Sequence, residues 1–323
     1  MDKIRRMNTV FEGGAPDCVP AGFWLHYPAE WGAKATAEAH LGLYKATDMD
    51  IIKIMDDSSC SYLTDVVKIT KAADWEKINL PGTNCWHYQR MSEIIKRLAG
   101  AVSGEAMLFP TVWSPFKIAS FTYASSGLSD ADFMDDCFKN PESIIKGVEA
   151  ISSVLEQFVA GYIDSGGDGI YFSAQFSEPG RFTDEQWAQL VMPYDLRVIN
   201  AAKKAGKRVI VHICGEPEYE FRTTPGRYAD YPGDLFNWAV HRNSLDLQGG
   251  RALFKRPVLG GLHNRGALVS GDEESIRSEV RKIISHAGRA GFMLGADCTV
   301  PADVSYDRLR YAVEEAHSHS AVC

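Results

Sequence analysis

Short apolar runs alternate with longer amphipathic segments along most of the chain. Eight of the apolar runs have the length and composition of strands, and several are continuously hydrophobic, as expected for strands buried on both faces. They are residues 22–27, 51–56, 107–113, 168–174, 208–214, 244–247, 257–262 and 291–296. Strand-like runs separated by helix-like segments predict repeated βα units around a parallel sheet.

Helical periodicity is clearest in three segments between the predicted strands. Residues 141–165 carry apolar side chains at spacings of three and four, with a proline at the start. Thr183 is the expected N-cap of a second helix that runs to Gly206, and residues 272–289 repeat the pattern. Eight strands with helices between them favour a (β/α)8 TIM barrel. A doubly wound open sheet is the alternative, because local patterns cannot show closure.

The longest interval between two predicted strands separates the second from the third, at residues 58–105. This excursion holds Trp75, Trp86, Tyr88 and the turn at residues 80–82. A long, aromatic-rich connection is typical of a functional loop, and we expect it to cap part of the barrel mouth.

Composition narrows the class of protein. A hydrophobic fraction of 45% and a charged fraction of 24% are ordinary for a globular chain, and no linker divides residues 1–323, which we expect to form one domain. The net charge of −8 argues against a nucleic-acid partner. The N-terminus lacks an apolar signal segment, and no membrane span is expected. Seven scattered cysteines do not form a disulfide framework, which favours a cytoplasmic location.

Three residues combine into a candidate zinc site. His212 and Cys214 lie two apart at the end of a predicted strand, so both side chains point to the same side. Cys298 follows the last predicted strand and would reach the same barrel mouth. Imidazole and thiolate ligands suit Zn²⁺, and three protein ligands leave one position for a substrate. Burial of the cysteines as ordinary core residues is the alternative at this point.

Several stretches resemble the uroporphyrinogen decarboxylase superfamily, over nearly the whole chain. GAPDCVPAGFW resembles the segment before its first strand, and residues 167–206 resemble its fourth strand, loop and helix, with the turn at Pro193 and Tyr194. VIVHICG, VLGGL and FMLGADCTVP resemble the last parts of its barrel in order. The decarboxylases of this superfamily carry an arginine-rich run at the first strand, where this chain has FWLHYPAEWG without arginine.

The resemblance is closer to the zinc-dependent methyltransferase branch, which moves methyl groups between a corrinoid protein and a thiol such as coenzyme M, or takes part in related demethylations. It implies zinc bound by His212, Cys214 and Cys298, and a small-molecule methyl donor or acceptor. The chain lacks a D-x-H-x-x-G signature, so the corrinoid would be carried by a separate protein. The branch usually has glycine where this chain has Asp297 and Thr299, which leaves the acceptor open. Relatives often dimerise.

Three further interpretations stay open on the sequence. A decarboxylase acting on a porphyrinogen would need carboxylate-binding arginines at the barrel mouth. An O-demethylase component would act on an aromatic methyl ether, for which dense aromatic residues near the strand ends would form a pocket. A non-catalytic barrel would hold zinc in a closed, four-ligand structural site.

Other polar residues near strand ends are candidates for the same site. Glu178 is a candidate fourth zinc ligand, with a solvated turn residue as the alternative, and Glu216 competes for the ligand role. His26 and His263 end the first and seventh predicted strands, where each can serve as an acid or base or pack as a structural histidine. Asp57, next to Asp56 after the second strand, is a candidate for orienting substrate.

Overall fold

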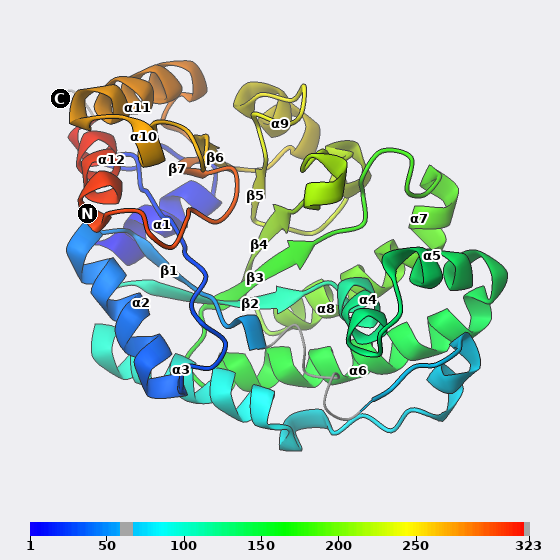
Figure 1. Ribbon diagram of the computed structural model, residues 1–323. Coiled ribbons are helices and arrows are strands. Elements are labelled where there is room, and N and C mark those ends of the chain that lie inside the picture. Colours follow the sequence, from blue (N-terminus) through cyan, green and yellow to red (C-terminus); the bar gives the residue numbers. More distant parts are fainter. Residues whose placement is uncertain (59–66, 320–323) are drawn as a thin grey trace.

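A computed structural model describes residues 1–58 and 67–319 of the chain. These residues form a seven-stranded parallel sheet in the order β1-β2-β3-β4-β5-β6-β7, which is curled and surrounded by helices (Figure 1). The strands are β1 (Ile51–Ile54), β2 (Met107–Trp113), β3 (Gly169–Ala174), β4 (Arg208–Ile213), β5 (Leu235–Trp238), β6 (Val258–Leu262) and β7 (Phe292–Ala296).

One or more helices follow every strand. The α-helices are α1 (Lys3–Phe11), α2 (Ala33–Thr47), α3 (Trp86–Val102), α4 (Pro115–Ser125), α5 (Asp130–Lys139), α6 (Pro141–Asp164), α7 (Asp184–Leu190), α8 (Met192–Lys204), α9 (Leu247–Phe254), α10 (Ala267–Ser270), α11 (Glu273–Ala287) and α12 (Tyr306–Ser318). Short 3₁₀ helices are η2 (Ala72–Lys77), η3 (Gly82–Asn84), η4 (Pro217–Tyr219) and η5 (Pro225–Tyr228). Within the described ranges, no helix has the length and apolarity that crossing a bilayer would require.

The predicted helices form, with one interruption. The helices at 141–165 and 272–289 correspond to α6 and α11. Thr183 caps α7, as its hydroxyl accepts a hydrogen bond from the Gln186 amide. The predicted helix to Gly206 is instead two helices, because Pro193 has no amide hydrogen and the helix breaks at Val191.

Six of the eight predicted strands are confirmed within one or two residues. The prediction at residues 244–247 is wrong: Asp246 accepts a hydrogen bond from the Gly249 amide, caps α9, and so places Leu247 in a helix. The strand lies upstream, at β5, where the polar Asn237 interrupts the apolar run that would otherwise have marked it.

The first predicted strand, residues 22–27, is not a regular strand, so a barrel of eight strands is not confirmed. The Gly22 amide donates to the Leu294 carbonyl of β7, and the Ala21 carbonyl accepts from the Asp50 amide just before β1. The buried Asp50 carboxylate accepts from the Ala21 amide at 2.8 Å and pairs with Arg6 and His317. A few single hydrogen bonds therefore join this segment to β7 on one side and to the residue before β1 on the other.

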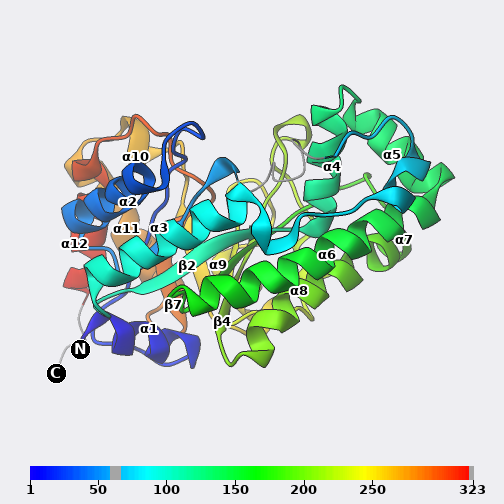
Figure 2. The ribbon, with the colours of Figure 1, turned by 90° about the horizontal axis from the view of Figure 1, so that it is seen from below.

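The expected capping role of residues 58–105 is not confirmed. Its last part is α3, which packs against α2. The described middle part, with η2 and η3, lies along the outside of α6 (Figure 2), where the Trp75 ring stacks on Tyr123 at 6.2 Å between centroids. Residues 59–66 of the excursion lie outside the described ranges.

Inside the curled sheet, an apolar layer lies beneath a polar one. Ile51, Ile210 and Leu235 belong to a buried apolar cluster that also takes in Met7, Val10 and Phe11 of α1. Because side chains two apart in a strand point to the same side, Lys53, His212 and Asn237 form the next layer toward the carboxyl ends. The strands thus place Lys53, His212 and Asn237 next to the buried apolar cluster, on its side toward the carboxyl ends.

Asp195, in α8, is fully buried, and no ion pair of its carboxylate is found among the described residues. Its oxygens accept hydrogen bonds from the Ser114 hydroxyl at 2.7 Å and the Tyr231 hydroxyl at 3.0 Å. Burial raises the pKa of Asp195 from 3.8 to about 7, although both hydrogen bonds oppose the rise. The folded state therefore binds this proton more tightly than the unfolded state, and the group lowers stability as pH rises from about 4 to about 7.

Asp195→Asn is expected to flatten the pH dependence of the free energy of unfolding between pH 4 and pH 8. A neutral amide keeps hydrogen bonds to both hydroxyls. Because it does not ionise, the variant should not show the decrease in the free energy of unfolding, at most about 4 kcal/mol, that Asp195 causes across this range. Urea unfolding of wild type and variant at several pH values measures the difference. Equal slopes in the two proteins would contradict it.

Candidate metal centre

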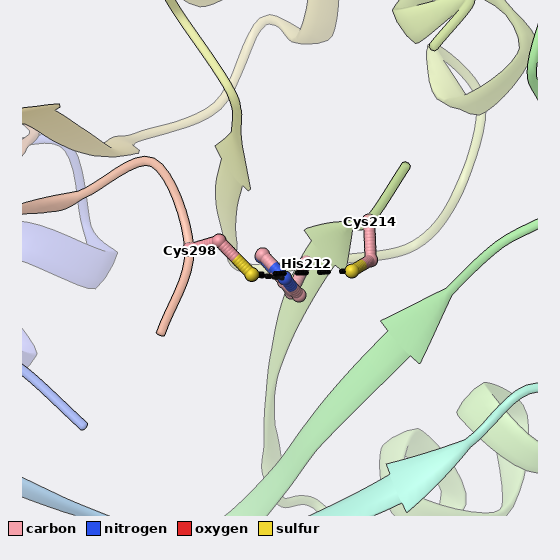
Figure 3. Close-up of side chains that lie close together, drawn as sticks. All are labelled: His212, Cys214 and Cys298. Atoms are coloured by element: carbon pink, nitrogen blue, oxygen red, sulfur yellow. Dashed lines mark hydrogen bonds between the residues drawn. The ribbon is translucent and has the colours of Figure 1, made fainter. Parts of the chain in front are cut away.

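Three side chains converge at the carboxyl end of the sheet. His212 is the penultimate residue of β4, Cys214 follows the strand, and Cys298 follows β7. The Cys214 and Cys298 sulfur atoms are 4.0 Å apart, and the Cys298 sulfur lies 3.5 Å from Nε2 of His212. Figure 3 shows the imidazole between the two cysteine side chains, which approach from opposite sides. The residues predicted from spacing are therefore brought together, with all three ligand atoms within 4.8 Å.

These separations fit a zinc ion. Bond lengths near 2.3 Å to sulfur and 2.0–2.1 Å to nitrogen give tetrahedral edges of about 3.8 Å between sulfurs and about 3.6 Å between sulfur and nitrogen. Both observed separations lie within a few tenths of an ångström of these values. Two thiolates and an imidazole are also the donor set that zinc prefers over harder cations.

Asn237 fixes the orientation of His212. Its side-chain nitrogen donates to the Leu259 and Ala296 carbonyls at 2.9 and 3.1 Å, so its side-chain oxygen must face the imidazole. That oxygen lies 2.5 Å from Nδ1 of His212, which therefore carries the hydrogen. The lone pair of Nε2 is left to face Cys298 and a metal, the arrangement that outer hydrogen bonds give to metal-binding histidines.

Contact between the two thiols moves their pKa values in opposite directions. The Cys214 and Cys298 sulfurs share a hydrogen bond, which holds the pKa of Cys298 well below its ordinary value. The same contact, with burial, raises the pKa of Cys214 well above its ordinary value. Binding of a divalent cation would release protons from these thiols, because cysteine binds a metal as the thiolate.

A hydrogen-bonded chain leads from the group to His26. The Trp24 indole donates to the Thr299 hydroxyl at 3.0 Å, and this hydroxyl lies 3.0 Å from Nε2 of His26. Nδ1 of His26 lies 2.6 Å from the Asp57 carboxylate. The predicted residues His26 and Asp57 are therefore paired. Thr299, where the resemblance led us to expect glycine, is the residue after Cys298 and links this pair to the candidate metal centre.

Asp56 has a different environment from Asp57. Its carboxylate is buried, pairs with Arg90 at 3.1 Å and accepts from the Ser58 hydroxyl at 2.7 Å. It anchors the chain after β1.

Glu178 and His263 lie outside the group of three. The buried Glu178 carboxylate accepts from the Glu216 amide at 3.3 Å and lies 3.5 Å from Arg181, while Glu216 itself pairs with Lys117 at 2.7 Å. Glu178 as a fourth ligand stays a prediction.

His263 packs edge-to-face on His241, with ring centroids 5.0 Å apart, and its Nδ1 accepts from the Arg265 amide. Burial lowers the pKa of His263, so the imidazole is neutral near pH 7. Its catalytic role is likewise an untested prediction.

A cavity of about 340 Å³ opens beside the three residues. His26, Arg242, Asn264 and Arg265 supply polar groups to its wall, and Phe221 and residues 300–302 supply apolar surface. No ion pair of Arg242 or Arg265 is found among the described residues, although both line the cavity. Its size is at the small end of the range for small-molecule sites.

Sequence reasoning missed Asn237, Lys53 and the role of Thr299. Asn237 was missed because its strand was expected elsewhere, and a polar residue within an apolar run was the available signal. Lys53, in β1, interrupts an apolar run in the same way. A charged residue inside a strand predicted to be buried on both faces should have been taken as a candidate.

The sequence model of the uroporphyrinogen decarboxylase (URO-D) family matches residues 33–319. The chain belongs to the URO-D family. This URO-D protein superposes on a methyltransferase from Methanosarcina mazei with a TM-score of 0.82 at 12% identity, covering 98% of this chain and 99% of the other.

A B12-independent methionine synthase from Shewanella sp. W3-18-1 superposes with a TM-score of 0.57 at 14% identity, covering 93% and 95% of the two chains. A search among curated protein sequences found no match. At these identities, both superpositions show that the URO-D protein shares a fold with proteins of methyl metabolism.

Zinc analysis tests the group directly. Purified wild type is expected to hold about one zinc ion per chain, and Cys298→Ala and His212→Ala to hold much less, because each removes one of three ligands. Elemental analysis after desalting measures the content. Cys18→Ala, which alters a buried cysteine outside the group, is the matched control and should match wild type. A wild type without stoichiometric zinc would rule out the site.

Asn237→Ala is expected to weaken zinc binding by about 10- to 100-fold, since it frees the imidazole to turn. Competition with a chromophoric chelator measures the affinity, and thermal unfolding of the metal-free variant checks that it is folded. Unchanged affinity in a folded variant would show that His212 is oriented by other contacts.

Proposed function

We propose that this URO-D family protein is a zinc-dependent methyltransferase that moves a methyl group between a corrinoid carried on a separate protein and a small-molecule thiol. The observation that carries the proposal is the grouping of His212, Cys214 and Cys298 beside a cavity, with spacings suited to tetrahedral zinc. The fold shared with a Methanosarcina mazei methyltransferase supports the reaction class.

Zinc, when bound by these residues, would supply a Lewis acid that keeps a substrate thiol deprotonated near neutral pH. The thiolate sulfur would accept the methyl group of the corrinoid substrate: the sulfur–carbon bond would form as the carbon–cobalt bond breaks, and the electron pair of the broken bond would stay with the corrinoid. In the reverse direction the same site would activate a methylated small molecule. The cavity accommodates a compact substrate next to both cysteines.

His26 is the proposed acceptor of the thiol proton. It lines the cavity, and the Asp57 carboxylate holds Nδ1, so that Nε2 faces Thr299 and the interior of the site. With the hydrogen of the neutral imidazole on Nδ1 toward the carboxylate, Nε2 keeps the lone pair that can accept a proton. The proton would leave through an exposed side chain, since 45% of the His26 side-chain surface is accessible.

Porphyrinogen decarboxylation is less well supported, despite the family name. The segment at residues 22–32 carries no arginine, although Arg242 and Arg265 line the cavity elsewhere. Two adjacent thiols weigh against decarboxylation, because that reaction makes no use of them. The thiols also require a reducing environment, which is the reason to keep the cytoplasm as the proposed location.

Methyl transfer from methylcobalamin to 2-mercaptoethanol, homocysteine and coenzyme M tests the reaction. Cys298→Ala is expected to lose at least about 100-fold in rate, because the metal site contributes several kcal/mol of charge stabilisation. Loss of the methylcobalamin absorption spectrum measures the rate, and Cys18→Ala is the control.

Equal rates in Cys298→Ala and wild type would contradict the proposed site. Transfer from methyltetrahydrofolate but not from methylcobalamin would leave the thiol chemistry in place and replace the corrinoid as donor.

A further inference from the structure

Lys53 is a buried lysine inside the curled sheet. The residue is 5% exposed and lies in β1, two residues toward the carboxyl end from Ile51, which belongs to the buried apolar cluster inside the sheet. No hydrogen bond or ion pair of its ammonium group is found in residues 1–58 and 67–319. A buried ammonium without an anionic partner is costly to maintain, so its position requires an explanation.

Two aromatic rings hold the ammonium beside the candidate metal centre. Nζ of Lys53 lies 4.3 Å from the centre of the Trp24 ring and 4.1 Å from that of Tyr171. Both rings also pack on the His212 imidazole, with centroids 5.7 and 5.9 Å apart. The ammonium and the zinc-binding imidazole therefore share the same two aromatic neighbours.

Negative charge at the centre reaches Lys53. Burial lowers the pKa of Lys53 to about 7, and the charges of Cys298, Cys214 and Asp57 act in the opposite direction. The rings alone do not replace the hydration that the ammonium has lost. The anionic groups whose charge acts on Lys53 are thus the two cysteine sulfurs of the candidate metal centre and Asp57.

A charge count limited to the metal ligands and Lys53 favours an anionic fourth ligand. Zn²⁺ with two thiolates and a neutral imidazole has no net charge, and a third thiolate makes it −1. The ammonium of Lys53 returns this sum to zero. A neutral fourth ligand, such as an ether, amine or thioether, leaves the buried site at +1 instead. Net charge in a poorly solvated site is disfavoured.

We propose that Lys53 is the counter-charge of the metal centre and selects a substrate that binds as a thiolate. This inference rests on the proposed function and assigns to Lys53 the preference for the thiolate over its neutral, methylated form. It also gives a reason for product release: methylation turns the anionic sulfur into a neutral thioether, and the attraction of the ammonium for it is lost.

The test compares two probes on cobalt(II)-loaded protein, in which thiolate binding produces a charge-transfer band. The probes are 2-mercaptoethanol and its S-methyl ether. Lys53→Met keeps an unbranched apolar chain between the rings and removes the charge. It is expected to weaken binding of 2-mercaptoethanol by about tenfold or more, with little change for the thioether.

Lys203→Met is the matched control. Lys203 lies in α8 and pairs with Asp234, which comes just before the amino end of β5. This pair is away from the carboxyl ends of the strands, where the site lies. It should bind both probes as wild type does. If Lys53→Met does not fold, Lys53→Gln removes the same charge and gives the same measurement.

The outcomes separate the two proposals. Equal thiol affinity in wild type and Lys53→Met, or an equal loss for both probes, overturns the counter-charge and leaves the metal-dependent function standing. A wild type that binds no metal overturns the proposed function, and the counter-charge with it.

Discussion

The hydrogen bonds of one buried amide hold the candidate metal centre together. Asn237 lies on β5, donates to carbonyls of β6 and β7, and accepts from His212 of β4. Four neighbouring strands are therefore tied at the level where the ligands emerge. Because the amide has no freedom to turn, the tautomer of His212 is fixed, and so is the nitrogen offered to a metal. The position of Cys298 relative to Cys214 depends on the same strands.

Period-two alternation explains most of what the sequence could predict. His212 and Cys214 point to the same side because they lie two apart in a strand, and parallel strands bring Cys298 to the same end. These are local rules, and the resulting prediction that the three residues meet is confirmed. The strands with continuous apolar runs were also predicted within one or two residues.

What failed depended on contacts distant in sequence. Residues 22–27 look like a strand, yet the segment is fixed by Leu294 and Asp50, neither of which a local pattern can supply. β5 was missed because Asn237 replaces an apolar residue in order to bond three other strands. Polar residues that serve the site are thus the ones that disturb the pattern, as expected where function departs from local consistency.

The segment that takes the place of an eighth strand also concerns access to the site. Trp24 and His26 both lie on it, one beside Lys53 and the other against Thr299. Its backbone is held by single hydrogen bonds and one isolated bridge rather than by a ladder, so local opening breaks few bonds here. Amide hydrogens of this segment would then exchange with solvent ahead of those in β3 and β4. The same fluctuation would withdraw an aromatic wall and a proton acceptor together, opening a route for a large partner to reach the metal.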